Sequence, residues 1–268
     1  MTLSLLEWYN REKRILPFRN IDNPYKIWLS EIMLQQTQVD TMIPYFNRWI
    51  KKYPTLQSVA NEDQEKLLKM WEGLGYYSRC RNFHKAIKIV FNQYSGIVPN
   101  NWTDFRALPG VGDYTAAAVL SIAYHQPYPV IDGNVKRVMA RLLGLKNLTK
   151  RNMSRMNRYL NEHISKDFPG DFNQGMMELG AGICSPKNPD CGKCPVSNFC
   201  KGFLMGSPES YPKYIKKEKT PHYEIVAGII WRDDKFYIQK RGEKGMLAGL
   251  WEFPGGKVEK GETLEEAL

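Results

Sequence analysis

A nine-residue stretch, Leu108–Ala116 (LPGVGDYTA), lies between two segments with helical periodicity. Gly110 and Gly112 allow the chain to turn tightly and to expose backbone N–H groups at the start of the following helix. Such N–H groups bind phosphate oxygens without reading base sequence. An ordinary turn between helices would explain two glycines equally well. The glycines alone therefore do not distinguish a phosphate-binding hairpin from such a turn. If the hairpin binds phosphate, it would use Leu108, Gly110, Val111 and Gly112.

The sequence around this hairpin is predominantly helical up to residue 200. Apolar residues recur with the helical period, and short connections rich in Gly, Pro and Asn separate the segments. Asn23 followed by Pro24 is typical of a helix start. The segments expected to be helical are Ile27–Thr37, Ile43–Lys52, Asp63–Met70, Arg79–Tyr94, Tyr114–Tyr124, Asn134–Leu143, Ser154–Ser165 and Asn173–Cys184.

The character of the sequence changes after Cys200. Residues 206–221 contain three prolines and a run of Lys and Glu, which is typical of a linker. Strands are expected at Tyr223–Trp231, Lys235–Arg241 and Trp251–Phe253, with a hairpin turn at Asp233-Asp234 and a helix start at Glu262. This pattern predicts that residues 222–268 are part of an α+β domain. Because about 47 residues are too few for a stable core of this kind, we expect the sequence to stop inside that domain.

The composition narrows the class of protein. The chain has 268 residues, 43% of them hydrophobic, and a formal net charge of +10. This hydrophobic fraction indicates a folded core rather than disorder. The positive charge favours a polyanionic partner, because Lys and Arg displace counterions from phosphates, although a merely soluble basic protein would share it. The sequence shows neither a secretion signal nor a membrane span, so we expect a cytoplasmic protein in a reducing compartment.

Four of the five cysteines are close together in the sequence. Cys184, Cys191, Cys194 and Cys200 have the spacing C-x6-C-x2-C-x5-C. In a reducing compartment such a group indicates a metal centre rather than disulfides. Tetrahedral zinc and a [4Fe–4S] cluster both use four thiolates. Zinc ligands more often come as two C-x2-C pairs, and here only the middle pair has that spacing. The remaining Cys80 is expected to be a small buried residue.

Two carboxylates have contrasting sequence environments. Glu31 lies in a helical segment with Ile27, Trp28 and Leu34 one turn away, which would keep its carboxyl desolvated and protonated. Asp132 precedes a helix start, where backbone N–H groups would favour the ionised form. Enzymes that cleave glycosidic bonds use such a pair, one group as acid and the other facing developing positive charge. A solvent-facing glutamate and a plain helix cap are the simpler alternatives, and spacing alone does not choose between them.

The hairpin string and the cysteine spacing resemble the endonuclease III superfamily of helix-hairpin-helix DNA glycosylases, which favours the [4Fe–4S] cluster over zinc. Two further strings, WLSEIMLQQTQV (Trp28–Val39) and VIDGNVKRV (Val130–Val138), are similar to the adenine DNA glycosylase family, which removes adenine mispaired with 8-oxoguanine. This similarity implies that Glu31 protonates the adenine ring, that Asp132 stabilises the cationic sugar, and that Asn134 helps to order the site.

Position 114 bears on the type of reaction. Strand-cutting members of the superfamily have a lysine there that forms a Schiff base, whereas this chain has Tyr114, which the resemblance places in the catalytic site. Without an amine nucleophile, we expect a monofunctional glycosylase that leaves an abasic site. The resemblance also implies that Gln36 and Tyr76 contact DNA by entering the duplex beside the target base, which must leave the stack. The alternatives are an endonuclease III-like glycosylase and lyase acting on oxidised pyrimidines, and a non-catalytic DNA-binding protein.

The resemblance implies a mostly α fold, a helix-hairpin-helix DNA glycosylase followed by an incomplete α+β Nudix-like segment. The catalytic region would comprise residues 1–205, with a six-helix barrel at 24–128 and an iron–sulfur helical lobe formed by 1–23 and 129–205. A linker at 206–221 and a partial Nudix-like domain at 222–268 would follow.

Gly256–Glu262 matches the opening of a Nudix box, G-x5-E, so a Nudix pyrophosphatase is a rival enzyme, although the rest of its metal site would lie beyond Leu268. In adenine glycosylases a Nudix-like domain recognises 8-oxoguanine, and we expect this chain to lack much of that recognition. The expected partner is double-stranded DNA with an A:8-oxoguanine or A:G mispair. We expect no membrane partner, a monomer, and a bacterial cytoplasm near the nucleoid.

Overall fold

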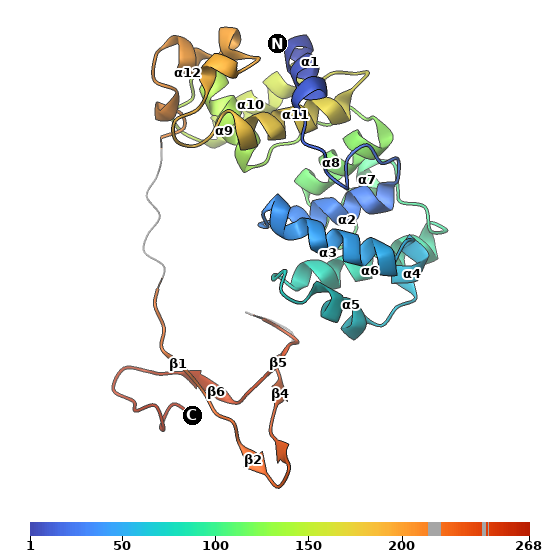
Figure 1. Cartoon of the computed structure of the whole chain (residues 1–268), viewed down its shortest axis with the longest axis vertical. Coiled ribbons are helices and arrows are strands. Elements are labelled where there is room, and N and C mark those ends of the chain that lie inside the picture. The colour runs from blue at the N-terminus through green and yellow to red at the C-terminus, as the bar shows by residue number, and fades with distance from the viewer. Residues whose placement is uncertain (214–220, 243–244, 246) are drawn as a thin grey trace. The chain divides into compact units, whose positions relative to one another are not determined.

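The computed structural model describes residues 1–213, 221–242, 245 and 247–268. These residues divide into two compact units, a larger helical one and a smaller one built from short strands (Figure 1). The mostly α class predicted from the sequence is confirmed. None of the helices in the described ranges has both the length and the apolar character needed to cross a bilayer.

Most helices of the larger unit lie where the periodicity predicts. They are α1 (Thr2–Glu12), α2 (Pro24–Leu34), α3 (Val39–Lys52), α4 (Leu56–Ala60), α5 (Gln64–Trp71), α6 (Ser78–Gln93), α7 (Trp102–Arg106), α8 (Asp113–Tyr124), α9 (Gly133–Leu143), α10 (Lys150–His163), α11 (Pro169–Gly182) and α12 (Lys201–Leu204), with 3-10 turns η1 (Cys191–Lys193), η2 (Ser197–Phe199) and η3 (Pro208–Ser210). The short α4, α7 and α12 carry too few residues to show a period. The longer α1 is absent from the predicted set, although its buried Leu5, Trp8 and Tyr9 have helical spacing.

An aromatic core holds α2, α3 and α5–α7 together. The ring of Trp28 on α2 lies edge-on to Phe83 and Phe105, with centroids 5.0 and 5.1 Å apart. Trp49 on α3 makes the same type of contact with Trp71 on α5, at 5.7 Å. Edge-to-face pairs of this kind stabilise a fold beyond the area that they bury. The inner face of α2 is therefore firmly fixed.

A second core joins the N-terminal helix to helices from the later part of the larger unit. Leu5 on α1, Met139 on α9 and Phe172 on α11 are buried in it. Figure 1 shows α1 and α11 side by side, away from α3–α6. The two cores are consistent with the two lobes that the resemblance implies. We propose that residues 24–128 form the barrel and that residues 1–23 and 129–205 form the iron–sulfur lobe.

The helix that carries the predicted acid starts where expected and ends earlier. Asn23 accepts a hydrogen bond from a first-turn backbone N–H at 3.1 Å, and Pro24 occupies the first helical position. The periodicity predicts a helix as far as Thr37, but α2 ends at Leu34. The reason is the left-handed backbone of Gln36, whose φ is 56°, a conformation that apolar spacing does not reveal.

The smaller unit consists of three antiparallel strand pairs. β1 (Ile225–Ala227) pairs with β6 (Gly255–Lys257), β2 (Trp231–Arg232) with β3 (Lys235–Phe236), and β4 (Gln239–Lys240) with β5 (Trp251–Glu252). The predicted hairpin at Asp233-Asp234 is confirmed as β2–β3. The prediction of a single strand at Tyr223–Trp231 is wrong, because this stretch contains β1 and the start of β2 as separate strands. β1 pairs with β6, a partner distant in the sequence that alternation does not identify. At the helix start predicted near Glu262 the chain forms turns.

The linker predicted at 206–221 begins with residues that pack on the larger unit. The backbone oxygen of Tyr211 accepts a hydrogen bond from Arg141 Nε at 3.2 Å, and the N–H of Lys213 donates to the oxygen of Lys146 at 2.7 Å. The packed chain therefore extends to Lys213. Residues 214–220 of the predicted linker lie outside the described residues.

Helices α9 and α11 approach closely beside the predicted catalytic segment. Gly180 on α11 faces Asn134 in the first turn of α9. A Cβ at position 180 would lie 2.6 Å from the Asn134 Cβ and 3.2 Å from its Cα. Only a residue without a side chain fits there. This contact fixes the start of α9 against the second core.

Gly180→Ala is expected to destabilise the fold by roughly 1–3 kcal/mol, because the added methyl group overpacks this contact. Gly182→Ala in the same helix is the control, since nothing lies within 4 Å of a Cβ at that position. The control should be neutral or should stabilise the fold by up to about 1 kcal/mol through helix propensity. Urea denaturation measures both effects, and equal effects at the two positions would contradict the close contact.

Candidate active site

The four residues predicted to be catalytic line one pocket. Glu31, Tyr114, Asp132 and Asn134 come from α2, α8 and the start of α9, and they border a cavity of about 190 Å³. The helix α2 therefore meets α8 and the start of α9, which lie some 80 positions or more later in the sequence.

Glu31 is buried, which confirms the expectation from its apolar neighbours. The residue is 6% exposed. Burial raises the pKa of its carboxyl from 4.5 to about 7, while the hydrogen bond from Tyr114 opposes the rise, the charge of Asp132 adds to it and the charge of Arg19 opposes it. Near neutral pH a large fraction of Glu31 is therefore protonated and able to donate a proton.

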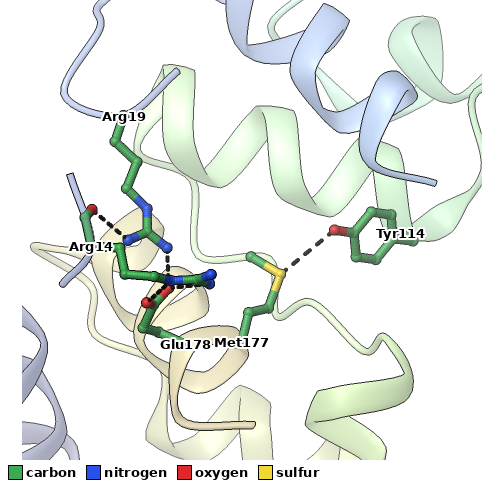
Figure 2. Close-up of polar contacts among 5 residues, drawn as sticks. All are labelled: Arg14, Arg19, Tyr114, Met177 and Glu178. Atoms are coloured by element: carbon green, nitrogen blue, oxygen red, sulfur yellow. Dashed lines mark hydrogen bonds and ion pairs between the residues drawn. The ribbon is translucent and has the colours of Figure 1, made fainter. Parts of the chain in front are cut away.

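Tyr114 contacts this carboxyl from α8. Its hydroxyl donates a hydrogen bond to Glu31 Oε2 at 2.8 Å. The same hydroxyl lies 3.5 Å from Met177 Sδ on α11 (Figure 2). Burial, with the nearby charge of Glu31, raises the pKa of the Tyr114 hydroxyl well above its usual value. The phenol therefore stays protonated and acts as a fixed donor.

Asp132 caps α9, as the sequence predicts. Its Oδ1 accepts a hydrogen bond from the backbone N–H of Val135 at 2.6 Å, and its Oδ2 accepts one from Asn134 Nδ2 at 3.3 Å. Arg137 Nη2 in turn donates to Asn134 Oδ1 at 2.9 Å and to the backbone oxygen of Gly180 at 2.7 Å. A chain of contacts that runs back to α11 thus orients the carboxylate.

Three charged residues outside the predicted set, Arg14, Arg19 and Glu178, also line the pocket. Glu178 on α11 accepts hydrogen bonds from Arg14 Nε and Nη2, at 2.5 and 3.1 Å, and from Arg19 Nη2 (Figure 2). Burial alone would raise the pKa of Glu178, but the two guanidinium groups outweigh it and hold that pKa below its usual value. Two cations against one carboxylate leave this wall of the pocket with excess positive charge.

A sequence signal for Glu178 exists. It is an acidic residue in an apolar helical context, between Met177 and Leu179. No comparable signal marks Arg14 and Arg19, because they lie in the irregular segment between α1 and α2. Neither periodicity nor capping patterns predict which side chains of such a segment turn inward.

A wider cleft of about 510 Å³ brings together several predicted DNA contacts. Gln36, Gly110 and Gly112 line it, together with Tyr114 and Asp132. Gly110 has a left-handed φ of 78°. Within the described structure, no side chain caps the first N–H groups of α8 after Gly112. The glycines of the hairpin therefore border a cleft in which phosphate oxygens can accept hydrogen bonds.

The other predicted DNA contacts, Leu108, Val111 and Tyr76, are not among the residues that line this cleft. Leu108 and Val111 are 5% and 3% exposed, and the N–H of Val111 donates to the oxygen of Leu108 at 3.1 Å. These two residues shape the hairpin from inside. Tyr76 is 58% exposed and has a left-handed φ of 48°.

The four clustered cysteines converge on one small cavity. Cys184, Cys191, Cys194 and Cys200 line it, with Arg141 from α9 beside them. Arg141 Nη1 lies 3.3 Å from Cys184 Sγ. Burial raises the pKa of the Cys194 thiol to about 12, and the charges of the other three cysteines add to the rise. The thiols are therefore close enough to influence one another's ionisation.

This set of donors fits an iron–sulfur cluster. Four cysteine thiolates around one cavity are the ligand set that a four-iron cluster uses. Cys80 lies apart on α6 and is 1% exposed, as predicted.

Three known families match consecutive parts of the chain. The HhH-GPD superfamily of base excision DNA repair proteins matches residues 29–162, the iron–sulfur binding domain of endonuclease III matches residues 184–200, and the NUDIX domain matches residues 226–268. The second match contains all four clustered cysteines. A [4Fe–4S] cluster is therefore the cofactor for which these ligands are arranged.

Curated relatives named adenine DNA glycosylase match almost the whole chain. The one from Buchnera aphidicola subsp. Schizaphis graminum is 37% identical over 253 residues, which covers 93% of this chain and 73% of that protein. This chain belongs to the adenine DNA glycosylase family. The Arabidopsis thaliana and Homo sapiens members are 36% and 34% identical over 94% and 98% of this chain, but the match covers only 46% and 58% of those proteins. The chain thus spans about half the length of these two members.

Solved structures of the superfamily share the fold. A thermostable thymine-DNA glycosylase aligns with a TM-score of 0.70 and 28% identity, covering 76% of this chain and 95% of that one. A trapped endonuclease III–DNA covalent intermediate aligns with a TM-score of 0.63 and 24% identity over the same shares of the two chains. The helix-hairpin-helix glycosylase fold predicted from the sequence is confirmed.

The raised pKa of Glu31 predicts a pH-dependent stability. The carboxyl titrates near 4.5 when unfolded and near 7 when folded. Below pH 4.5 the carboxyl is protonated in both states, so its ionisation does not affect the free energy of unfolding. Between pH 4.5 and 7 the carboxyl ionises in the unfolded chain but stays protonated in the folded one, so the free energy of unfolding falls by about 3 kcal/mol in total and stays at that lower value above pH 7.

Glu31→Gln removes this loss of stability. We expect it to raise the free energy of unfolding by up to about 3 kcal/mol at pH 8 and to change it little at pH 4.5. Glu7→Gln, at an exposed position of α1, should show no such dependence. Urea denaturation at the two pH values measures the effect, and a Glu31→Gln effect of the same size at both would contradict the raised pKa.

Proposed function

We propose that this chain hydrolyses the N-glycosidic bond of adenine in double-stranded DNA, where the adenine is mispaired with 8-oxoguanine or guanine. The proposal depends chiefly on one observation, a buried Glu31 carboxyl with a pKa of about 7 that is hydrogen-bonded to Tyr114 and shares a pocket with Asp132. The name of the curated relatives, adenine DNA glycosylase, supports the choice of base.

Glu31 is the general acid of the proposed reaction. It transfers its proton to a ring nitrogen of adenine while the bond between the base and C1′ of the sugar breaks, and both bonding electrons leave with the base. The sugar becomes an oxocarbenium ion, which the negative charge of Asp132 stabilises. Water then adds to C1′ and releases a proton, which restores the acid form of Glu31. The products are free adenine and an abasic site.

Tyr114 and Asn134 act as positioning residues. Tyr114 fixes the Glu31 carboxyl through the hydrogen bond at 2.8 Å, and Asn134 donates to Asp132 at 3.3 Å. A phenol forms no Schiff base with the abasic sugar. We therefore propose a monofunctional glycosylase that does not cut the strand.

The hairpin and its cleft are the proposed DNA-binding surface. Backbone N–H groups around Gly110 and Gly112 would bind phosphate, and the net charge of +10 favours the approach of a polyanion. Gln36 borders the same cleft, and Tyr76 is exposed. These two side chains would enter the stack beside the target base and offset the cost of extruding it.

The cluster has a structural role in this proposal. When bound, it crosslinks the chain between Cys184 and Cys200. Arg137 Nε donates to the backbone oxygen of Cys184 at 2.8 Å, and Arg137 Nη2 donates to Asn134 at 2.9 Å. The cluster would thereby keep the Asp132 segment in place.

Further parts of the proposal concern the setting of the reaction. Residues 222–268 are proposed to belong to a Nudix-like domain that contributes to recognition of 8-oxoguanine, since the NUDIX family matches residues 226–268. The protein is proposed to act on DNA as a monomer, without a membrane partner, near the nucleoid of a bacterial cell.

A base-release assay with A:8-oxoguanine, A:G and thymine-glycol duplexes tests the proposed activity. Adenine should be released from the first two duplexes, and the strand should break only after alkali treatment. The single-turnover rate should fall as the pH rises above about 7, because Glu31 then loses its proton.

The variant Glu31→Gln should lower this rate at least about 100-fold and leave DNA affinity unchanged. The surface variant Glu7→Gln should match the wild type. Strand cleavage before alkali, or undiminished release by Glu31→Gln, would contradict the proposal.

A further inference from the structure

Arg79, near the start of α6, contacts the end of the catalytic helix. The residue is 8% exposed. Its Nη1 donates hydrogen bonds to the backbone oxygens of Ile32 and Met33, at 3.1 and 2.9 Å, and to that of Gln35. These oxygens lie at the C-terminal end of α2, where a helix leaves carbonyl groups without intrahelical partners. A cation there also complements the negative end of the helix dipole.

The same guanidinium group contacts the loop before α6. Its Nη2 donates to the backbone oxygens of Leu74 and Gly75, both at 3.1 Å. The group lies over the ring of Trp71, 5.5 Å from its centroid, and Trp71 Nε1 donates to the Gly75 oxygen at 3.0 Å. Nη1 also donates to Thr37 Oγ1 at 3.3 Å. Arg79 thus binds the end of α2 and the loop after it through Nη1, and it binds the loop before α6 through Nη2.

The peptide groups that Arg79 binds precede Gln36 and Tyr76. The Gln35 oxygen belongs to the peptide group before Gln36, and the Gly75 oxygen belongs to the one before Tyr76. Both following residues have left-handed backbones, with φ of 56° and 48°. Residues other than glycine keep this conformation only where their surroundings hold it. Both are exposed, and both are the residues proposed to enter the duplex.

We propose that Arg79 is a positioning residue that keeps Gln36 and Tyr76 in register with each other and with the catalytic helix α2. This role rests on the proposed function, because it concerns the two side chains that would open the duplex. A planar guanidinium group with five N–H donors can bind both loops at once, whereas a lysine ammonium group is a point charge with three donors. Arg79→Lys therefore keeps the charge and loses the simultaneous contacts.

The test compares Arg79→Lys with Arg48→Lys. Arg48 also donates to a backbone oxygen, that of Met70 at 2.9 Å, but at the exposed surface. For both variants we would measure adenine release in a single turnover, affinity for an undamaged duplex, and the fluorescence of 2-aminopurine placed beside the target base. Arg79→Lys should release adenine roughly tenfold more slowly, with a delayed rise in fluorescence and unchanged affinity. Arg48→Lys should match the wild type in all three.

A double-variant cycle separates positioning from a merely structural role. If Arg79 acts largely through Tyr76, Arg79→Lys should slow release much less in a Tyr76→Ala background than in the wild type. Losses that simply multiply, or a wild-type rate in Arg79→Lys, would overturn the inference. A wild-type protein that releases no adenine would instead overturn the proposed function.

A second variant keeps the test decisive if Arg79→Lys does not fold. Thr37→Val removes one acceptor of the guanidinium group and leaves the others in place. It should slow release by a smaller factor, with the same dependence on Tyr76. Release at the wild-type rate by a folded Thr37→Val would then count against the role of Arg79.

Discussion

The hydrogen bond from the Tyr114 hydroxyl to the Glu31 carboxyl is the contact on which the candidate site depends. It joins residues 83 positions apart and brings α2 and α8 together at the pocket. A buried carboxyl needs a hydrogen-bond partner, because an unsatisfied polar group in the interior is costly. A lysine or arginine in place of the phenol would stabilise the ionised form more strongly and lower the pKa of Glu31. A neutral donor satisfies the carboxyl and still leaves it able to act as an acid.

The charges around the pocket leave the pKa of Glu31 raised, as a general acid requires. Arg19 lowers the pKa of Glu31 only as a lesser influence than burial. Glu178 accepts hydrogen bonds from both Arg14 and Arg19, so part of their charge is directed at another carboxylate. The positive charge that remains on this wall suits a DNA ligand without overriding the effect of burial on Glu31.

Local patterns were enough to predict the residues whose environment is set by their own helix. The burial of Glu31 follows from apolar residues one turn away, and the capping role of Asp132 follows from its place before α9. The pocket wall of Arg14, Arg19 and Glu178 could not be predicted in this way, because it forms only when the N-terminal segment meets α11, some 160 positions later (164 for Arg14 and 159 for Arg19). The pairing of β1 with β6 escapes prediction for the same reason. The left-handed backbone of Gln36 ends α2 earlier than its apolar period suggests, and the peptide group before it is bound by Arg79, a residue from another helix.

The most direct test of the account is the titration of Glu31 itself. Carbon-13 NMR of the side-chain carboxyl carbon, assigned by comparison with Glu31→Gln, measures its pKa in the folded protein. A midpoint of about 7, as burial beneath Tyr114 requires, would support a carboxyl that is poised as a general acid. A midpoint at the ordinary value of 4.5 would contradict the central claim, because the group would then be ionised at neutral pH and unable to protonate the departing base.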